Sequence, residues 1–214
     1  MIGTATARYA DSPDPSPADG VTGRRFFDTA SGLWMVKVFP GEYYVTRKTD
    51  EVLVTILGSC VSACIRDPVA GIGGMNHFML AQGAENGWGD DLRSTRYGNF
   101  AMEKLINELI KAGCQRHSLE IKLFGGGNVT DSRNLIGTQN ATFVREYLAS
   151  EGLRWVAEDL GGPYPRRIQY NAQSGRVIRK LLNRTESAGV AREEADYAST
   201  LSKRKTTGEV ELFA

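Results

Sequence analysis

Residues 55–80 read TILGSCVSACIRDPVAGIGGMNHFML, a β-forming run broken by a Gly-Ser turn and by an Asp-Pro turn signal. Cys60 directly follows the Gly-Ser turn, so its thiol is expected to be exposed at the end of a strand. His77 lies on the next arm of the expected hairpin. The strands predicted in this part of the chain cover residues 52–57, 61–65 and 72–80.

The flanking sequence adds helices and further strands. Residues 99–112 are predicted to form an amphipathic helix, because apolar side chains recur every three or four residues and Gly113 follows at a C-cap position. A second helix is expected to end near Ser150. Additional strands are expected at residues 33–39, 119–124, 153–157 and 177–181. This mixture predicts a domain of the α/β or α+β class.

The chain divides into three predicted regions. Residues 1–31 are expected to form a flexible segment, because the stretch DSPDPSPADG cannot bury enough apolar surface to offset its ordering entropy. The folded domain is expected over residues 32–183. Residues 184–214 form a charged C-terminal extension, in which a helix is expected over residues 191–205 before the short apolar tail GEVELF.

Composition narrows the classes of function. Lys and Arg number 26 against 25 for Asp and Glu, so no net field favours nucleic acid or an anionic membrane. The uncharged run at residues 52–65 is too short to span a bilayer, and no signal peptide is evident. Three cysteines, Cys60, Cys64 and Cys114, are an odd and sparse set that favours a reducing compartment. We therefore expect a soluble, cytoplasmic protein.

Cys60 and His77 are the candidates for chemistry. A nucleophilic thiol needs a neighbouring base and a backbone that lets a planar carbonyl approach, and an adjacent histidine and glycine can supply these. We accordingly expect Cys60 to hold more thiolate, and to alkylate sooner, than Cys64 or Cys114. The pattern alone also fits an ordinary buried cysteine and a core histidine.

Motifs spread along residues 33–182 resemble those of the chemoreceptor glutamine deamidase (CheD) family: LGSC, RDP, GGMNHFML, TRYGNFAMEKLINELIKAG, LEIKLFGGGNV, IGTQN, EDLGGPYPRRIQYN and SGRVIRK. The resemblance implies that Cys60 attacks the side-chain amide of receptor glutamines, that His77 acts as the base, and that Thr55 completes the site. It also implies a layered sandwich of mixed β-sheet and helices, similar to the catalytic domains of glutamine-deamidating toxins.

The implied chemistry sets further expectations. Backbone N–H groups near Gly58, Ser59 and Cys60 are placed to hold the oxyanion, and neither a metal nor an organic cofactor is needed. The substrates implied are the cytoplasmic helices of methyl-accepting chemoreceptors, and a chemotaxis phosphatase of the CheC type is a second candidate partner. Two rival functions are a glutamyl methylesterase acting on the same receptors and a non-catalytic adaptor. A general cysteine protease has less support.

Other residues invite simpler interpretations. Cys64 is expected in the core, too far along a strand from Cys60 to share a zinc ion. Cys114 and His117 are interpreted as a solvated pair in a polar loop. The stretch FGGGN, residues 124–128, lacks the Gly-Lys-Ser/Thr ending of a phosphate loop and is interpreted as a tight backbone turn beside the site. Solvation is likewise favoured for two further side chains, Arg166 and Arg167.

Overall fold

Two five-stranded sheets and three α-helices make up the computed structural model, which describes residues 24–80, 89–129 and 135–203. The first sheet has the order β1 (Arg24–Asp28), β2 (Leu33–Lys37), β4 (Glu51–Leu57), β9 (Arg166–Tyr170) and β10 (Val177–Leu181). The second has the order β3 (Tyr43–Thr46), β6 (Ile72–Asn76), β5 (Val61–Asp67), β7 (Glu120–Gly125) and β8 (Trp155–Leu160). The helices are α1 (Gly89–Lys111), α2 (Ile136–Ser150) and α3 (Arg184–Lys203).

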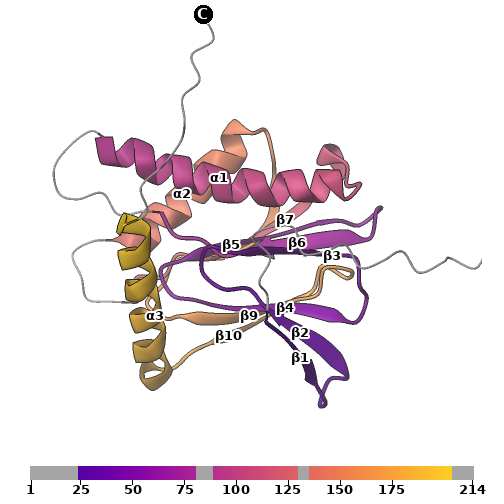
Figure 1. The fold of residues 1–214 in the computed structure, drawn as a ribbon, viewed down its shortest axis with the longest axis horizontal. Coiled ribbons are helices and arrows are strands. Elements are labelled where there is room, and N and C mark those ends of the chain that lie inside the picture. Colours follow the sequence, from indigo (N-terminus) through magenta and orange to yellow (C-terminus); the bar gives the residue numbers. More distant parts are fainter. Residues whose placement is uncertain (1–23, 81–88, 130–134, 204–214) are drawn as a thin grey trace, which may run out of the picture.

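The elements form three layers. Helices α1 and α2 cover one face of the second sheet, the first sheet lies against its other face, and α3 stands across one end of the sandwich (Figure 1). Each sheet mixes parallel and antiparallel pairs, with β2–β4 and β7–β8 parallel. The predicted class, an α/β or α+β layered sandwich, is confirmed. None of the helices in the described ranges is long and apolar enough to cross a membrane.

Strand β5 shows how the layers place Cys60. Because successive side chains of a strand point to opposite faces, Val61, Ala63 and Ile65 pack toward α1 and α2. Cys60 and Cys64 point the other way, into the apolar core between the two sheets. Cys60 therefore lies inside the sandwich and is fully buried, rather than exposed at a strand end as predicted.

Most predicted elements are present, with shifted ends. The helix expected over residues 99–112 begins ten residues sooner, at Gly89, and the strand expected at residues 153–157 is β8, Trp155–Leu160. Three strands were not predicted: β1, β3 and β9. The expected domain start at residue 32 was too late, since β1 already pairs antiparallel with β2. Strand β1 lies at the sheet edge, where Phe26 and Phe27 stay half exposed, so it lacks the alternation that marks a half-buried strand.

The C-terminal region is not separate from the domain. Helix α3 begins at Arg184, earlier than the helix predicted over residues 191–205, and it buries Val190, Glu194 and Leu201. The GEVELF tail and residues 1–23 lie outside the described residues. Packing thus continues past residue 183.

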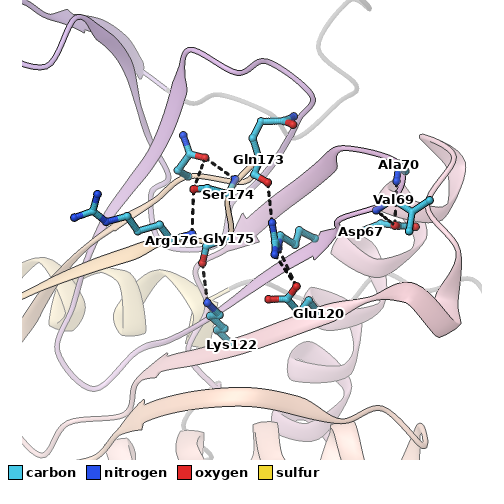
Figure 2. Close-up of polar contacts among 11 residues, drawn as sticks. Asp67, Val69, Ala70, Glu120, Lys122, Gln173, Ser174, Gly175 and Arg176 are labelled. Carbon is cyan, nitrogen blue, oxygen red and sulfur yellow. Dashed lines mark hydrogen bonds and ion pairs between the residues drawn. The ribbon is translucent and has the colours of Figure 1, made fainter.

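Polar contacts join the two sheets at the end of β5 that lies away from Cys60. Arg66 pairs with Glu120 at 2.7 Å and also donates to the Gln173 carbonyl, while Lys122 donates to the Gly175 carbonyl at 2.8 Å. Figure 2 shows how these bonds fix the turn between β9 and β10 over β5 and β7. The sheets are therefore clamped at this end, and the opposite end carries the cysteine.

Arg166 corrects a sequence expectation. Its side chain is 2% exposed and binds the Asp159 carboxylate as well as the carbonyl oxygens of Asp159 and Gly161. The predicted solvation of Arg166 was wrong because β9 was not anticipated, and the register of this strand turns the Arg166 side chain toward the protein interior. Arg167, the next residue, is exposed as expected.

We expect Arg166→Ala to lower the free energy of unfolding by about 3 kcal/mol, because it leaves buried carbonyl oxygens and a carboxylate without their donor. Arg167→Ala is the matched control, with an expected change within about 0.5 kcal/mol. Urea denaturation of both variants measures the difference. Equal effects would mean that the buried ion pair contributes nothing specific.

Candidate active site

The turn at residues 58–60 joins β4 to β5 and is held from behind by hydrogen bonds. Each of its three carbonyl oxygens accepts a bond from a neighbouring loop or from α2. The pairs are Gly127 N–H to Gly58 O (2.7 Å), Asn140 Nδ2 to Ser59 O (2.8 Å) and Gly126 N–H to Cys60 O (2.7 Å). With its carbonyls fixed on one side, the turn presents its N–H groups on the other.

Glycines make this bracing possible. Gly125 and Gly126 have φ of 108° and 64°, in the left-handed region that favours glycine. A Cβ atom at Gly125 would also collide with the carbonyl oxygen of Cys60. The FGGGN stretch therefore lies beside Cys60, but it is not the tight turn that was predicted: Phe124 and Gly125 end β7, and residues 126–128 continue as an irregular loop.

Gly125→Ala is expected to reduce catalysis by at least about tenfold and to lower stability, because the new methyl group displaces the carbonyl of Cys60. Gly113→Ala is a close control: its φ of 110° imposes the same backbone strain, yet no atom of the described residues lies within 4 Å of the new Cβ. Activity per folded molecule and melting temperature should be measured for both. Equal activity loss in the two variants would contradict a role for the brace.

The three N–H groups of the turn converge on one carboxylate, that of Glu194 in α3. Gly58 N–H and Cys60 N–H donate to Oε1 at 2.9 and 3.0 Å, and Ser59 N–H donates to Oε2 at 2.8 Å. The Ser59 hydroxyl donates a fourth hydrogen bond to this carboxylate, at 2.7 Å from Oε2. This turn is thus an anion-binding cradle of the kind that stabilises an oxyanion.

His77 lies close to the cradle, just after β6. Its Nδ1 is 2.8 Å from the Thr55 hydroxyl, which in turn is 2.8 Å from the Val38 carbonyl. A carbonyl only accepts, so the single Thr55 proton goes to Val38 and the hydroxyl accepts from Nδ1–H. This assigns the lone pair to Nε2, which is buried and has no hydrogen-bond partner in the described part of the chain.

The reactive groups are neutral in this state. Burial lowers the pKa of His77 to about 4, so the imidazole is unprotonated at neutral pH. Burial also raises the pKa of Cys60 well above its usual range, and the Glu194 carboxylate raises it further. Burial raises the pKa of Cys114 as well, to about 11. The pKa of Cys60 is raised first by its burial and then by Glu194, and neither feature is revealed by the local sequence. Faster alkylation of Cys60 than of Cys64 or Cys114 stays a prediction.

Among the described residues, one cluster could ligate a metal ion. Cys60 Sγ, a ring nitrogen of His77 and a carboxylate oxygen of Glu194 lie within 4.8 Å of one another. These are ligand types that zinc accepts. Both oxygens of Glu194 already accept two hydrogen bonds each, so metal binding would require that carboxylate to leave the cradle.

The structure brings together all five residues that the sequence indicated: Cys60, His77, Thr55, Gly58 and Ser59. It adds Glu194, which was missed. The sequence did hold a signal for it: Glu194 shares one helical face with Val190, Tyr197 and Leu201. Positions spaced in this way normally carry apolar side chains that pack against the core, so a glutamate among them is unusual.

The other cysteines lie apart from this cluster. Cys64 is buried in the core between the sheets, as expected. Cys114 is 2% exposed and packs among the side chains beneath α1, so its interpretation as half of a solvated pair was wrong. His117 is exposed, in agreement with the other half of that interpretation.

A thiol, a neutral imidazole and a cradle of three N–H groups are the components that a thiol-dependent amidohydrolase requires. Comparison with known proteins agrees with this class. A family model described as "CheD chemotactic sensory transduction" matches residues 79–181. The chain is also 53% identical over 190 residues to a "Probable chemoreceptor glutamine deamidase CheD" of Rhodopseudomonas palustris (strain BisA53), covering 89% of each chain. This chain belongs to the CheD family.

Further comparisons differ in weight. A relative of the same description from Halorhodospira halophila is 46% identical over 217 residues and spans 100% of both chains. Among solved structures, a Bacillus licheniformis hypothetical protein, YfiH, aligns with a TM-score of 0.37 and 13% identity over 55% of this chain and 49% of that one. This structural similarity is too low to inform function.

Proposed function

We propose that this chain hydrolyses the side-chain amides of specific glutamines in methyl-accepting chemoreceptors to glutamate and releases ammonia, with Cys60 as nucleophile. One observation carries the proposal: the N–H groups of residues 58–60 hold a glutamate carboxylate, the group that this reaction makes, beside the Cys60 thiol and the His77 ring. Membership of the family supports the choice of substrate.

In the first step, His77 Nε2 takes the thiol proton of Cys60 and the sulfur attacks the amide carbon of the glutamine side chain. The electron pair of the C=O bond moves onto oxygen. The resulting oxyanion is stabilised by the N–H groups of the turn, which already bind a carboxylate oxygen in the same place.

In the second step, the His77 imidazolium protonates the amide nitrogen, the C–N bond breaks and ammonia leaves. A thioester to Cys60 remains. His77 then takes a proton from water, the resulting hydroxide attacks the thioester carbon, and the thiolate is expelled and reprotonated. Water is the only co-reactant in this balance.

Thr55 is proposed as a positioning residue. By accepting from Nδ1–H while donating to the Val38 carbonyl, it fixes the tautomer that leaves Nε2 basic. This is the supporting role that a carboxylate plays in other triads, without adding a negative charge.

The proposed substrates are the cytoplasmic helices of the receptors, so we place the activity in the cytoplasm. A chemotaxis phosphatase of the CheC type is proposed as a second partner. Both assignments rest on the family.

The test is to incubate the protein with a receptor cytoplasmic fragment and to measure intact and peptide masses together with free ammonia. Each deamidation raises the mass by about 1 Da and releases one ammonia. A methylesterase would instead lower the mass of methylated receptor by about 14 Da without ammonia, and a protease would cut the backbone. Unchanged receptor masses with retained binding would favour the adaptor function.

A further inference from the structure

Helix α3 places a glutamate side chain, that of Glu194, in the cradle of residues 58–60. A glutamate side chain is also what the proposed reaction would leave there. The product of glutamine hydrolysis is a glutamate, and in a receptor it would be carried on a helix. Glu194 is a glutamate on a helix, and its side chain is 6% exposed and fully hydrogen-bonded by residues 58–60. The site therefore already contains a helical, product-like group supplied by its own chain.

The surface beneath α3 is shaped to receive a helix. Val190, Glu194, Tyr197 and Leu201 recur every three or four residues and share one face of α3. A Cβ atom at Gly58 would lie 2.7 Å from the Glu194 carboxylate. A second open position accommodates the next anchor along α3: a Cβ atom at Gly41 would lie 2.8 Å from the hydroxyl oxygen of Tyr197, which also hydrogen-bonds Tyr97.

Docking of α3 also closes the site chemically. Cys60 is 0% exposed, and Glu194 presents a negative charge where an uncharged amide must bind. All three N–H groups of the cradle are occupied by Glu194, those of Gly58 and Cys60 by Oε1 and that of Ser59 by Oε2. No substrate carbonyl can reach the sulfur and the cradle while Glu194 remains.

We propose that α3 is a tethered product mimic: it covers the surface on which a glutamine-bearing receptor helix docks, with Glu194 in the place of the product side chain, and it must leave before substrate binds. This inference rests on the proposed function for the identity of the substrate helix. Blocking of Cys60 by α3 does not depend on it.

The first arm of the test needs no receptor. Limited iodoacetamide treatment followed by peptide mapping measures how fast Cys60 is alkylated. Glu194→Ala should accelerate labelling of Cys60 by at least about tenfold, because the docked state loses its main polar anchor. Glu193→Ala changes an exposed neighbour and should leave the rate unchanged. Equal rates in wild type and Glu194→Ala, with melting temperatures showing both folded, would overturn the proposal.

The second arm tests the product-like pose with Glu194→Gln, which offers an amide to Cys60 inside the same molecule. The peptide containing residue 194 should gain about 1 Da over time, whereas in the double variant with Cys60→Ala its mass should stay constant. If the single variant folds and deamidates receptor but keeps its own amide, Glu194 is not in the product position and that part fails. If labelling is accelerated while no variant deamidates receptor, the proposed function fails and the block by α3 stands.

Discussion

Replacing Cys60 by alanine is expected to reduce receptor deamidation by at least about 10⁴-fold, the scale on which enzymes depend on a covalent nucleophile. Without the sulfur no thioester forms, and the remaining cradle can only polarise the amide toward a poorly placed water. Ammonia release and the receptor mass shift should vanish together.

Cys64→Ala is the matched control for this variant. Cys64 lies on β5, four residues after Cys60, and points into the same core. It is also buried to nearly the same extent, so both changes remove one buried sulfur and should cost similar stability. Only Cys60→Ala should lose activity while still binding receptor. If activity survives in Cys60→Ala, the nucleophile has been misassigned.

His77→Ala is expected to lower turnover by about 10²–10⁴-fold, the usual contribution of a general acid–base group. The loss follows because no other titratable group is placed by the described structure to accept the Cys60 proton except Glu194, which belongs to the departing helix. His117→Ala, the chain's other histidine, is exposed and should retain full activity. Comparable losses in the two variants would contradict the assignment.

The pH dependence of stability gives His77 a second readout. Its pKa is about 4 when folded against 6.5 for an unburied histidine, so protonation favours the unfolded chain. Above about pH 6.5 the neutral His77 leaves the free energy of unfolding at its full value. As the pH falls from 6.5 toward 4, protonation of the unfolded chain lowers that free energy by about 3 kcal/mol. His77→Ala should therefore lose less stability than wild type over this window, as measured by urea denaturation.

Sequence reasoning found the parts of the site that are local. Cys60 ends the turn between β4 and β5, His77 lies just after β6, which pairs with β5, and Thr55 precedes the same turn. Pairing of neighbouring strands is therefore enough to bring the three together. The separation of Thr55 and His77 is 22 positions. Short-range pairing of this kind can be anticipated from a hairpin pattern.

The contacts that were missed are non-local. Glu194 is 136 positions from Gly58 and reaches it only because α3 returns across the end of the sandwich. Arg166 was taken for a solvated residue because burial of an arginine depends on a partner, here Asp159, whose position follows from sheet register. Neither register nor the docking of a terminal helix is encoded in local periodicity.

The central claim, a thioester on Cys60, is tested most directly by adding hydroxylamine to the reaction with a receptor fragment. Hydroxylamine intercepts a thioester and yields a side-chain hydroxamate, which is about 16 Da heavier than the original glutamine, in competition with the glutamate that is about 1 Da heavier. We predict that the hydroxamate appears at the same receptor positions as glutamate, that its share increases with hydroxylamine concentration, and that Cys60→Ala forms neither product. Glutamate as the sole product at every hydroxylamine concentration would contradict the claim.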